Sequence, residues 1–246
     1  MPGPLFGKLA IVTGAGSGIG RAVCKVLARD GARIIAADKN LQTAMETITD
    51  LGSESSAVEV DVSSLDSVCK ALSTCIEKYK QPPSIVVNSA GITRDRYLLK
   101  MEERDYDDVY KVNLKGTFLI TQQFANAMVQ YKVSGSIVNI SSIAAKLTTI
   151  GQANYAASKS GVISFTEVAA KEFGKFNIRV NSILPGYIDT PMVDVVPQHI
   201  KEQARRICPL GRLGKPEEVA EVISFLASKK ASYINGASVE VTGGLS

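Results

Sequence analysis

The chain of 246 residues is 45% hydrophobic and 21% charged, with 20 glycines and 9 prolines, which is typical of a folded globular protein and excludes a disordered or collagen-like chain. Its 28 basic and 24 acidic residues give a net charge of +4, and because they are scattered they do not form the basic stripe of a nucleic-acid-binding protein. One histidine, His199, and four cysteines without a CxxC pair argue against a Cys/His zinc site and a Ser-His-Asp hydrolase, so we expect no metal.

Short β-branched runs alternate with longer segments of helical periodicity. The expected strands are 9–13, 33–37, 56–60, 84–88, 136–140, 179–184 and 238–241. The expected helices are 18–29, 41–51, 65–79, 114–131, 153–173 and 216–227. This alternation predicts the α/β class, as a single Rossmann-type domain over residues 1–246 whose doubly wound, seven-stranded parallel sheet has helices on both faces.

The stretch from Gly186 to Gly214 interrupts this alternation with glycines, prolines and a short amphipathic piece around 199–207. It follows the carboxyl end of an expected strand, where open α/β sheets bind ligands, and we interpret it as a substrate lid. Only residues 1–7 precede the first apolar run, too few for a signal peptide, and no apolar run is long enough to span a membrane. We therefore expect a soluble intracellular protein.

A glycine-rich loop, TGAGSGIG at 13–20, joins the first expected strand to the first expected helix. It fits the pattern G-x-x-x-G-x-G rather than G-x-G-x-x-G. Glycines in such a loop let backbone N–H groups and a helix N-terminus approach a pyrophosphate, although a plain strand-to-helix turn would use the same residues. The predicted cofactor-binding residues in this loop are Gly14, Ser17, Gly18, Ile19 and Gly20.

Asp38 ends the second expected strand, 18 residues after Gly20, close to the spacing of a carboxylate that bonds the adenosine ribose. The same carboxylate would repel a 2′-phosphate, and Ser17 stands where an arginine could have paired with that phosphate. The sequence therefore favours NAD(H) over NADP(H), with Lys39 as a small counterweight. Other residues at this sheet edge are expected to line the adenosine pocket, namely Asp61, Val62, Asn88, Ala90 and Gly91.

Four polar residues have a spacing that indicates catalysis. Tyr155 and Lys159 are four residues apart, hence on one face of an expected helix. Ser142 precedes the tyrosine by 13 residues, at the carboxyl end of the fifth expected strand, and Asn113 lies in the run VNLKG. In the order TGAGSGIG, NSAG, NISSIAA and YAASK, with a Pro-Gly turn at 185–186, these segments resemble the short-chain dehydrogenase/reductase superfamily over residues 8–244.

The resemblance implies a catalytic tetrad: Tyr155 as general acid/base, Ser142 as donor to the carbonyl oxygen, Lys159 as charge partner and ribose binder, and Asn113 as anchor of a water relay. It also implies cofactor contacts from Tyr155, Lys159, Pro185, Gly186, Ile188 and Thr190. A phenol has an ordinary pKa of about 10, and we expect the ammonium of Lys159, together with the charge of an oxidised nicotinamide, to lower it.

Within the superfamily the chain resembles the estradiol 17-beta-dehydrogenase 8 type, the alpha subunits of mitochondrial 3-oxoacyl-ACP reductases. This resemblance implies NAD-dependent interconversion of 3-hydroxyacyl and 3-oxoacyl thioesters in fatty acid metabolism, with possible 17-beta-hydroxysteroid oxidation, in the mitochondrial matrix. It also implies a homotetramer, or a heterotetramer with a related reductase subunit, built on helices 114–131 and 153–173. An apolar stripe would supply that interface: Val162, Phe165, Val168, Ala169 and Phe173.

A phosphopantetheine carrier such as acyl carrier protein would need cations near the entrance, for which Arg94, Arg96, Lys132 and Lys175 are candidates. The apolar residues expected to cover an acyl chain are Tyr187, Ile188, Met192, Val193, Val195 and Val196. Two alternatives stay open at this point. One is a steroid or xenobiotic carbonyl reductase of the same mechanism, and the other is an NAD-binding scaffold subunit of a reductase complex.

Overall fold

Seven parallel strands form one sheet in the order β3-β2-β1-β4-β5-β6-β7 in the computed structural model, which describes residues 3–52, 54–194 and 198–245. The strands are β1 (Leu9–Thr13), β2 (Arg33–Asp38), β3 (Ser56–Glu59), β4 (Ile85–Asn88), β5 (Gly135–Ile140), β6 (Ile178–Pro185) and β7 (Ser238–Val241). The strand order reverses beside β1, which is the topological switch point where doubly wound sheets bind ligands. The predicted fold class is confirmed.

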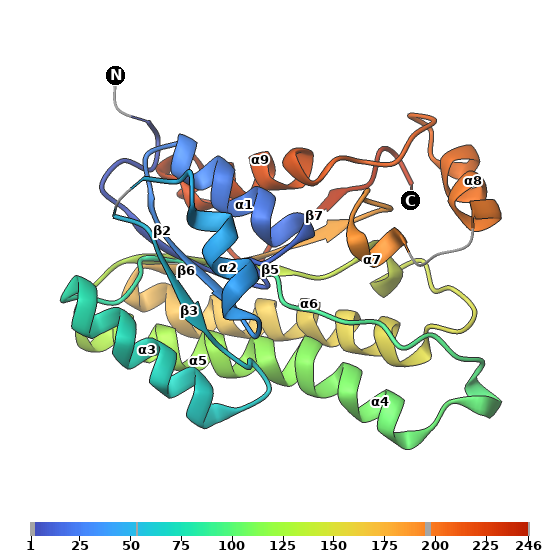
Figure 1. Ribbon diagram of the computed structural model, residues 1–246, viewed down its shortest axis with the longest axis horizontal. Helices are drawn as coiled ribbons and strands as arrows, with labels where there is room; N and C mark the ends of the chain where they lie inside the picture. The colour runs from blue at the N-terminus through green and yellow to red at the C-terminus, as the bar shows by residue number, and fades with distance from the viewer. Residues whose placement is uncertain (1–2, 53, 195–197, 246) are drawn as a thin grey trace.

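Helices cover both faces of the sheet (Figure 1). One face carries α1 (Gly18–Arg29), α2 (Leu41–Ile48) and α9 (Pro216–Ala227). The other carries α3 (Leu65–Tyr79), α5 (Gly116–Gln130) and α6 (Ala153–Phe173). Shorter helices are α4 (Glu103–Tyr110), α7 (Pro191–Asp194) and α8 (Gln198–Ile207), the π-helical turn η2 (Lys111–Lys115), and the 3-10 turns η1 (Leu98–Lys100), η3 (Ile143–Ala145), η4 (Gly174–Phe176) and η5 (Lys229–Ala231).

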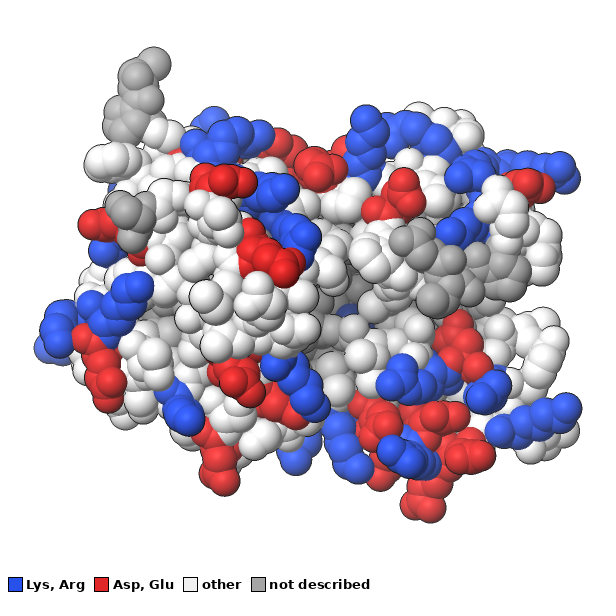
Figure 2. All heavy atoms as spheres, viewed as in Figure 1, with Lys and Arg blue, Asp and Glu red and all other residues white. Residues whose placement is uncertain are grey.

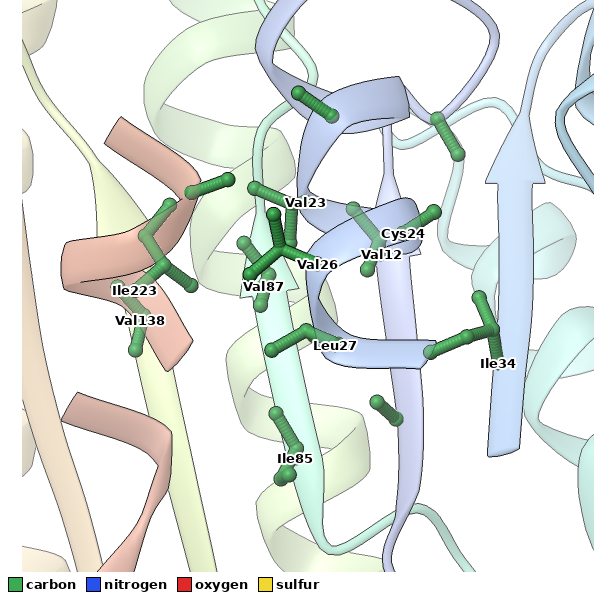
Figure 3. Close-up of a cluster of buried hydrophobic side chains, with 14 of the residues drawn as sticks. Val12, Val23, Cys24, Val26, Leu27, Ile34, Ile85, Val87, Val138 and Ile223 are labelled. Carbon is green, nitrogen blue, oxygen red and sulfur yellow. The ribbon is translucent and has the colours of Figure 1, made fainter. Parts of the chain in front are cut away.

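The core has two halves because the side chains of each buried strand alternate between the two faces. In β1, Ala10 and Val12 pack beneath α1 and α9, while Leu9 and Ile11 pack against the opposite helices. Figure 3 shows the first half, where Val23 and Leu27 of α1 meet side chains of β1, β4 and α9. This two-sided burial explains why the strands are apolar throughout, and it fixes the carboxyl edge of the sheet as a rigid platform.

Three helical segments differ from the predictions. Helix α2, expected over 41–51, ends at Ile48. The helix expected from residue 114 begins as the π-helical turn η2 and becomes α-helical only at Gly116. Helix α4 was not predicted, because it is only eight residues long and its sequence ERDYDDVY is mostly charged, with Val109 as its buried residue. Of the four cysteines, Cys24, Cys75 and Cys208 are buried, whereas Cys69 is half-buried.

Candidate active site

A cavity of about 820 Å³ opens at the carboxyl ends of the strands. Its walls come from the loops after the first six strands and from the segment 186–214, which includes α7 and α8. Figure 2 shows the corresponding face of the molecule hollowed near its centre. The cavity therefore lies where the sequence places the cofactor loop and the tetrad.

The glycine-rich loop after β1 has a backbone that needs glycine. Gly14 has φ of +65° and Gly18 has φ of +51°, in the left-handed region that disfavours side chains. A Cβ at Gly14 would lie 2.9 Å from the backbone of Ala90, and one at Gly20 would overlap the carbonyl oxygen of Gly14. Gly14, Ser17, Gly18, Ile19 and Gly20 all line the cavity, as the sequence predicts. The exposed backbone at this helix N-terminus fits a pyrophosphate group.

Asp38 lies at the end of the cavity beside this loop. Its Oδ2 accepts a hydrogen bond from the Gly16 N–H at 2.9 Å, and its Oδ1 accepts one from the Asn40 N–H at 3.0 Å. Asp61 and Val62 line the same end, with Lys39 between the two carboxylates in the chain. Each carboxylate oxygen of Asp38 retains one lone pair, so the residue fits the hydroxyls of an adenosine ribose.

Asn88 does not line the cavity, in contrast to the prediction. Its side chain is 4% exposed and donates hydrogen bonds to Thr121 Oγ1 at 3.0 Å and to Asn139 Oδ1 at 2.8 Å. The alternation of side chains along β4 directs it into the protein, where it joins β4 to β5 and α5. Ala90 and Gly91, further along the chain, do line the cavity.

Thr13 is a supporting residue that the sequence reading did not single out. Its hydroxyl oxygen accepts hydrogen bonds from the Ser89 and Ala90 N–H groups at 3.1 and 3.2 Å. The loops after β1 and β4 are thereby held together at the switch point. The available signal was its place at the start of TGAGSGIG, directly before the first glycine.

Ser142, Tyr155 and Lys159 meet in the cavity wall. Ser142 interacts with the Tyr155 side chain closely enough to lower the pKa of its phenol, and the Lys159 Nζ lies 5.7 Å from the centroid of the Tyr155 ring. The same ammonium donates a hydrogen bond to the Ile140 carbonyl at 2.7 Å, at the end of β5. A strand end and the face of α6 thus bring a hydroxyl, a phenol and an ammonium together.

Asn113 supports this group from behind. Its side chain is fully buried in η2, accepts from the Ile92 N–H at 2.9 Å and donates to Ser158 Oγ at 3.2 Å. A Cβ at Gly91 would lie 3.4 Å from Asn113 Oδ1 and 3.5 Å from Lys159 Nζ, so both side chains border the same piece of backbone. Asn113 therefore lies beside the other tetrad residues without lining the cavity. A π-helical turn at this position is typical of functional sites.

The pKa of Tyr155 differs from the expectation, because burial has a larger effect than the neighbouring ammonium. Burial raises the pKa of Tyr155, with the hydrogen bond from Ser142 opposing that rise, and the expected lowering by Lys159 is not seen in the protein chain alone. Burial also lowers the pKa of Lys159 to about 8, so its ammonium is itself destabilised. The prediction overlooked this desolvation, which the spacing of two residues on a helix cannot reveal.

The segment 186–214 is joined at its two ends. The Asp189 N–H donates to the Gly214 carbonyl at 2.9 Å, and the Gly214 N–H donates to the Tyr187 carbonyl at 2.9 Å. Pro185, Gly186, Ile188 and Thr190 line the cavity, as do Tyr187, Met192 and Val193. Val195 and Val196, also expected over the substrate, lie outside the described residues.

Two of the four candidate carrier-binding cations lie at the amino ends of the strands, opposite the edge of the sheet where the cavity opens. Lys132 precedes β5 and Lys175 precedes β6, whereas the cavity lies where these strands end. A parallel sheet returns every connecting helix to the amino edge, and both lysines follow such helices. Of the other two candidates, Arg94 lines the cavity, and Arg96 comes two residues after Arg94 in the chain.

The polar groups that line this cavity fit a nicotinamide dinucleotide. The glycine cradle suits the pyrophosphate, and Asp38 at the end of β2 suits a ribose. Tyr155 and Lys159 line the cavity near the end of β5, which β1 and β4 separate from β2. Within residues 3–52, 54–194 and 198–245, no group of three or more His, Cys, Asp or Glu side chains could hold a metal ion. A search of the helices in the same residues finds none with the length and apolarity to cross a membrane. Fold and site together define a Rossmann-type, nicotinamide-dependent oxidoreductase.

Comparison with known proteins identifies the family. The family model described as enoyl-(acyl carrier protein) reductase matches residues 14–246. A (3R)-3-hydroxyacyl-CoA dehydrogenase of Canis lupus familiaris is 50% identical, over 98% of this chain and 97% of its own. The 3-oxoacyl-[acyl-carrier-protein] reductase FabG of Thermotoga maritima is 43% identical, over 98% of both chains. A short-chain dehydrogenase/reductase of Mycobacterium marinum superposes with a TM-score of 0.93 at 31% identity, over 98% of this chain and 96% of that one. The chain belongs to the short-chain dehydrogenase/reductase superfamily and is an oxidoreductase with a nicotinamide cofactor.

Proposed function

We propose that this protein interconverts 3-hydroxyacyl and 3-oxoacyl thioesters of coenzyme A or acyl carrier protein, with NAD(H) as the cofactor, in fatty acid metabolism. The observation that carries this proposal is the meeting of Ser142, Tyr155 and Lys159 in one wall of a cavity whose other end holds Asp38. The relatives named for 3-hydroxyacyl and 3-oxoacyl thioesters, aligned over nearly the whole chain, support the substrate class.

The protein's part in the reaction is to bind the substrate oxygen and to move one proton. When bound, the nicotinamide supplies or accepts the hydride at the substrate carbon. The hydroxyl of Ser142 donates to the carbonyl oxygen, and in the reductive direction the phenol of Tyr155 gives its proton to that oxygen as the alcohol forms. The ammonium of Lys159 stabilises the phenolate of Tyr155 that remains, and the hydrogen bond to the Ile140 carbonyl holds this ammonium in place.

NAD(H) selection is supported by Asp38. Its carboxylate accepts from two backbone N–H groups, which fixes its position, and a 2′-phosphate beside it would meet a like charge. Measuring kcat/KM with NADH and NADPH tests this part. More efficient turnover with NADPH by the natural protein would refute it.

The substrate class is tested by a panel of four compounds assayed with NADH: a 3-oxoacyl thioester, a 2-enoyl thioester, a steroid 17-ketone and a quinone. The hydroxyls of Ser142 and Tyr155 suit a carbonyl oxygen, and two relatives are named for 3-hydroxyacyl and 3-oxoacyl substrates, so we expect the 3-oxoacyl thioester to react fastest, although the matching family model is described by enoyl reduction. The proposal includes 17-beta-hydroxysteroid oxidation as a second, slower activity. Turnover of the enoyl thioester or the steroid with none of the 3-oxoacyl thioester would overturn the proposal, and no turnover of any compound would favour a scaffold subunit.

We also propose a tetramer, either of identical chains or with a related reductase subunit, through α5 and α6. Within the stripe expected to form this interface, Val162 and Ala169 are already buried inside the chain, and Phe165 and Phe173 are partly buried against its core. Val168, which is 53% exposed, remains available on the outer face of α6. Light scattering tests the assembly, and a mass near 26 kDa would exclude it.

Docking of an acyl carrier protein is a further part of the proposal. Arg94 borders the cavity and Arg96 follows it, while Lys132 and Lys175 are withdrawn by their position. Reversing the charge of both arginines should raise KM for an acyl carrier substrate and spare a small ketone. The Lys132 and Lys175 double reversal is the matched control. A location in the mitochondrial matrix rests on the family resemblance and is tested by imaging a tagged chain.

A further inference from the structure

Lys39 and Asp61 form an ion pair at the adenosine end of the cavity. The Lys39 Nζ lies 2.8 Å from Asp61 Oδ2, and both residues line the cavity. They follow β2 and β3, neighbouring strands in which Asp38 is aligned with Glu59, so the sheet brings together two side chains 22 residues apart in the chain. The pair lies beside Asp38, the carboxylate expected to select the cofactor.

Asp61 is itself held in place. Its Oδ1 accepts hydrogen bonds from the Ser63 N–H at 3.0 Å and from the Ser63 hydroxyl at 2.6 Å, which leaves Oδ2 for Lys39. The pairing lowers the pKa of Asp61 and raises the pKa of Lys39, so both groups stay charged at neutral pH. Lys39 by contrast is 78% exposed on a flexible stem, so it is Asp61 that determines where the ammonium lies.

Lys39 is the cation with which this end of the cavity could bind a 2′-phosphate. Among the described cavity-lining residues, the other cations are Arg94, Lys111 and Lys159, which come from the segments after β4 and from α6. An ammonium next to Asp38 in the chain would offset the repulsion that Asp38 exerts on a phosphate. Its attachment to Asp61 therefore matters for the choice of cofactor.

We propose that Asp61 is a cofactor-specificity residue, which excludes NADP(H) by holding Lys39 away from the place of a 2′-phosphate. The inference rests on the proposed use of NAD(H). In it, Asp38 repels the phosphate, and Asp61 holds back the cation that lines this end of the cavity among the described residues. Releasing Lys39 should then admit NADP(H) although Asp38 is unchanged.

Binding of 2′,5′-ADP and 5′-AMP, measured by calorimetry without turnover, tests the proposal in a double-mutant cycle. Asp61→Asn keeps an oxygen for Ser63 but loses the charge, and it should tighten 2′,5′-ADP binding by about five-fold, the size of one partly exposed charge pair. In a Lys39→Gln background the same change should have little effect, because no ammonium is left to release. The gain should also shrink at high salt.

Glu221→Gln is the matched control, since it removes one carboxylate from an exposed ion pair with Arg29, 2.5 Å apart and outside the cavity lining. It should leave 2′,5′-ADP binding unchanged. Asp61→Ser repeats the test if the asparagine variant folds poorly. An equal gain from Asp61→Asn with and without Lys39, or no gain in either background, would overturn the proposal. Natural protein that binds 2′,5′-ADP as tightly as 5′-AMP would instead refute the NAD(H) preference itself.

Discussion

Replacing Lys159 with methionine should stabilise the free protein at neutral pH while abolishing its function. The Lys159 side chain is 4% exposed, and burial lowers its pKa from 10.5 to about 8. At 1.36 kcal/mol per pKa unit, holding the ammonium charged in this place costs about 3 kcal/mol at pH 7. Methionine has a similar volume and no charge, but it leaves the Ile140 carbonyl without its donor, at a cost of about 1 kcal/mol. The expected net gain is about 2 kcal/mol.

The pH dependence separates this cause from others. Below pH 8 the lysine is charged in both the folded and unfolded states, so the full cost is present. Between pH 8 and 10.5 the folded protein binds fewer protons than the unfolded chain, and the natural protein therefore recovers stability as the pH rises. Above pH 10.5 the advantage of the variant should be gone, and the lost hydrogen bond should leave it slightly less stable.

Urea unfolding of both proteins without cofactor, at pH 7, 8.5 and 10, measures the difference. Lys25→Met on the exposed surface of α1 is the control, since an exposed lysine has no burial cost to lose and its difference should not vary with pH. A Lys159→Met variant less stable than the natural protein at pH 7, with a difference that does not change up to pH 10, would refute the reasoning. Such a result would mean that the buried ammonium stabilises the fold.

Three further predictions concern the site and the core. Tyr155→Phe should lower kcat by about 10²- to 10⁴-fold while NADH still binds, as followed by fluorescence, and near-normal kcat would refute its role in proton transfer. Gly14→Ala should destabilise the protein and weaken NADH binding more than Gly52→Ala, because both have positive φ but only Gly14 has backbone 2.9 Å from the new Cβ; equal effects in thermal unfolding would contradict this. Leu27 is a fully buried residue of α1, so Leu27→Ala should lower the free energy of unfolding in urea by about 2–5 kcal/mol, whereas Leu99→Ala at a fully exposed position should change it by less than about 0.5 kcal/mol; equal values for the two variants would contradict this.

Much of the fold was predictable because its signals are local. The strand β1 and the helices α1, α3, α6 and α9 begin and end as the periodicity predicts, since their apolar spacing and terminal residues act over a few positions. Helix α2 ends three residues earlier than expected, at Ile48, and the short, mostly charged helix α4 was not predicted. A segment that buries one face has an apolar spacing from which its secondary structure can be predicted, whereas a mostly exposed segment has few apolar residues to show such a spacing.

The candidate site likewise has features that the local sequence predicts and features that depend on the tertiary structure. The spacing of Tyr155 and Lys159 on one helix, and the glycines after β1, identified these parts of the cavity wall from the sequence, because helix geometry and backbone sterics do not depend on distant residues. Only the tertiary structure decided that Asn88 turns inward and that Lys132 lies at the far edge of the sheet. The pairing of Lys39 with Asp61 likewise depends on the register between two strands and on the direction of each side chain. Such properties come from how distant segments are placed against one another, which no local pattern encodes.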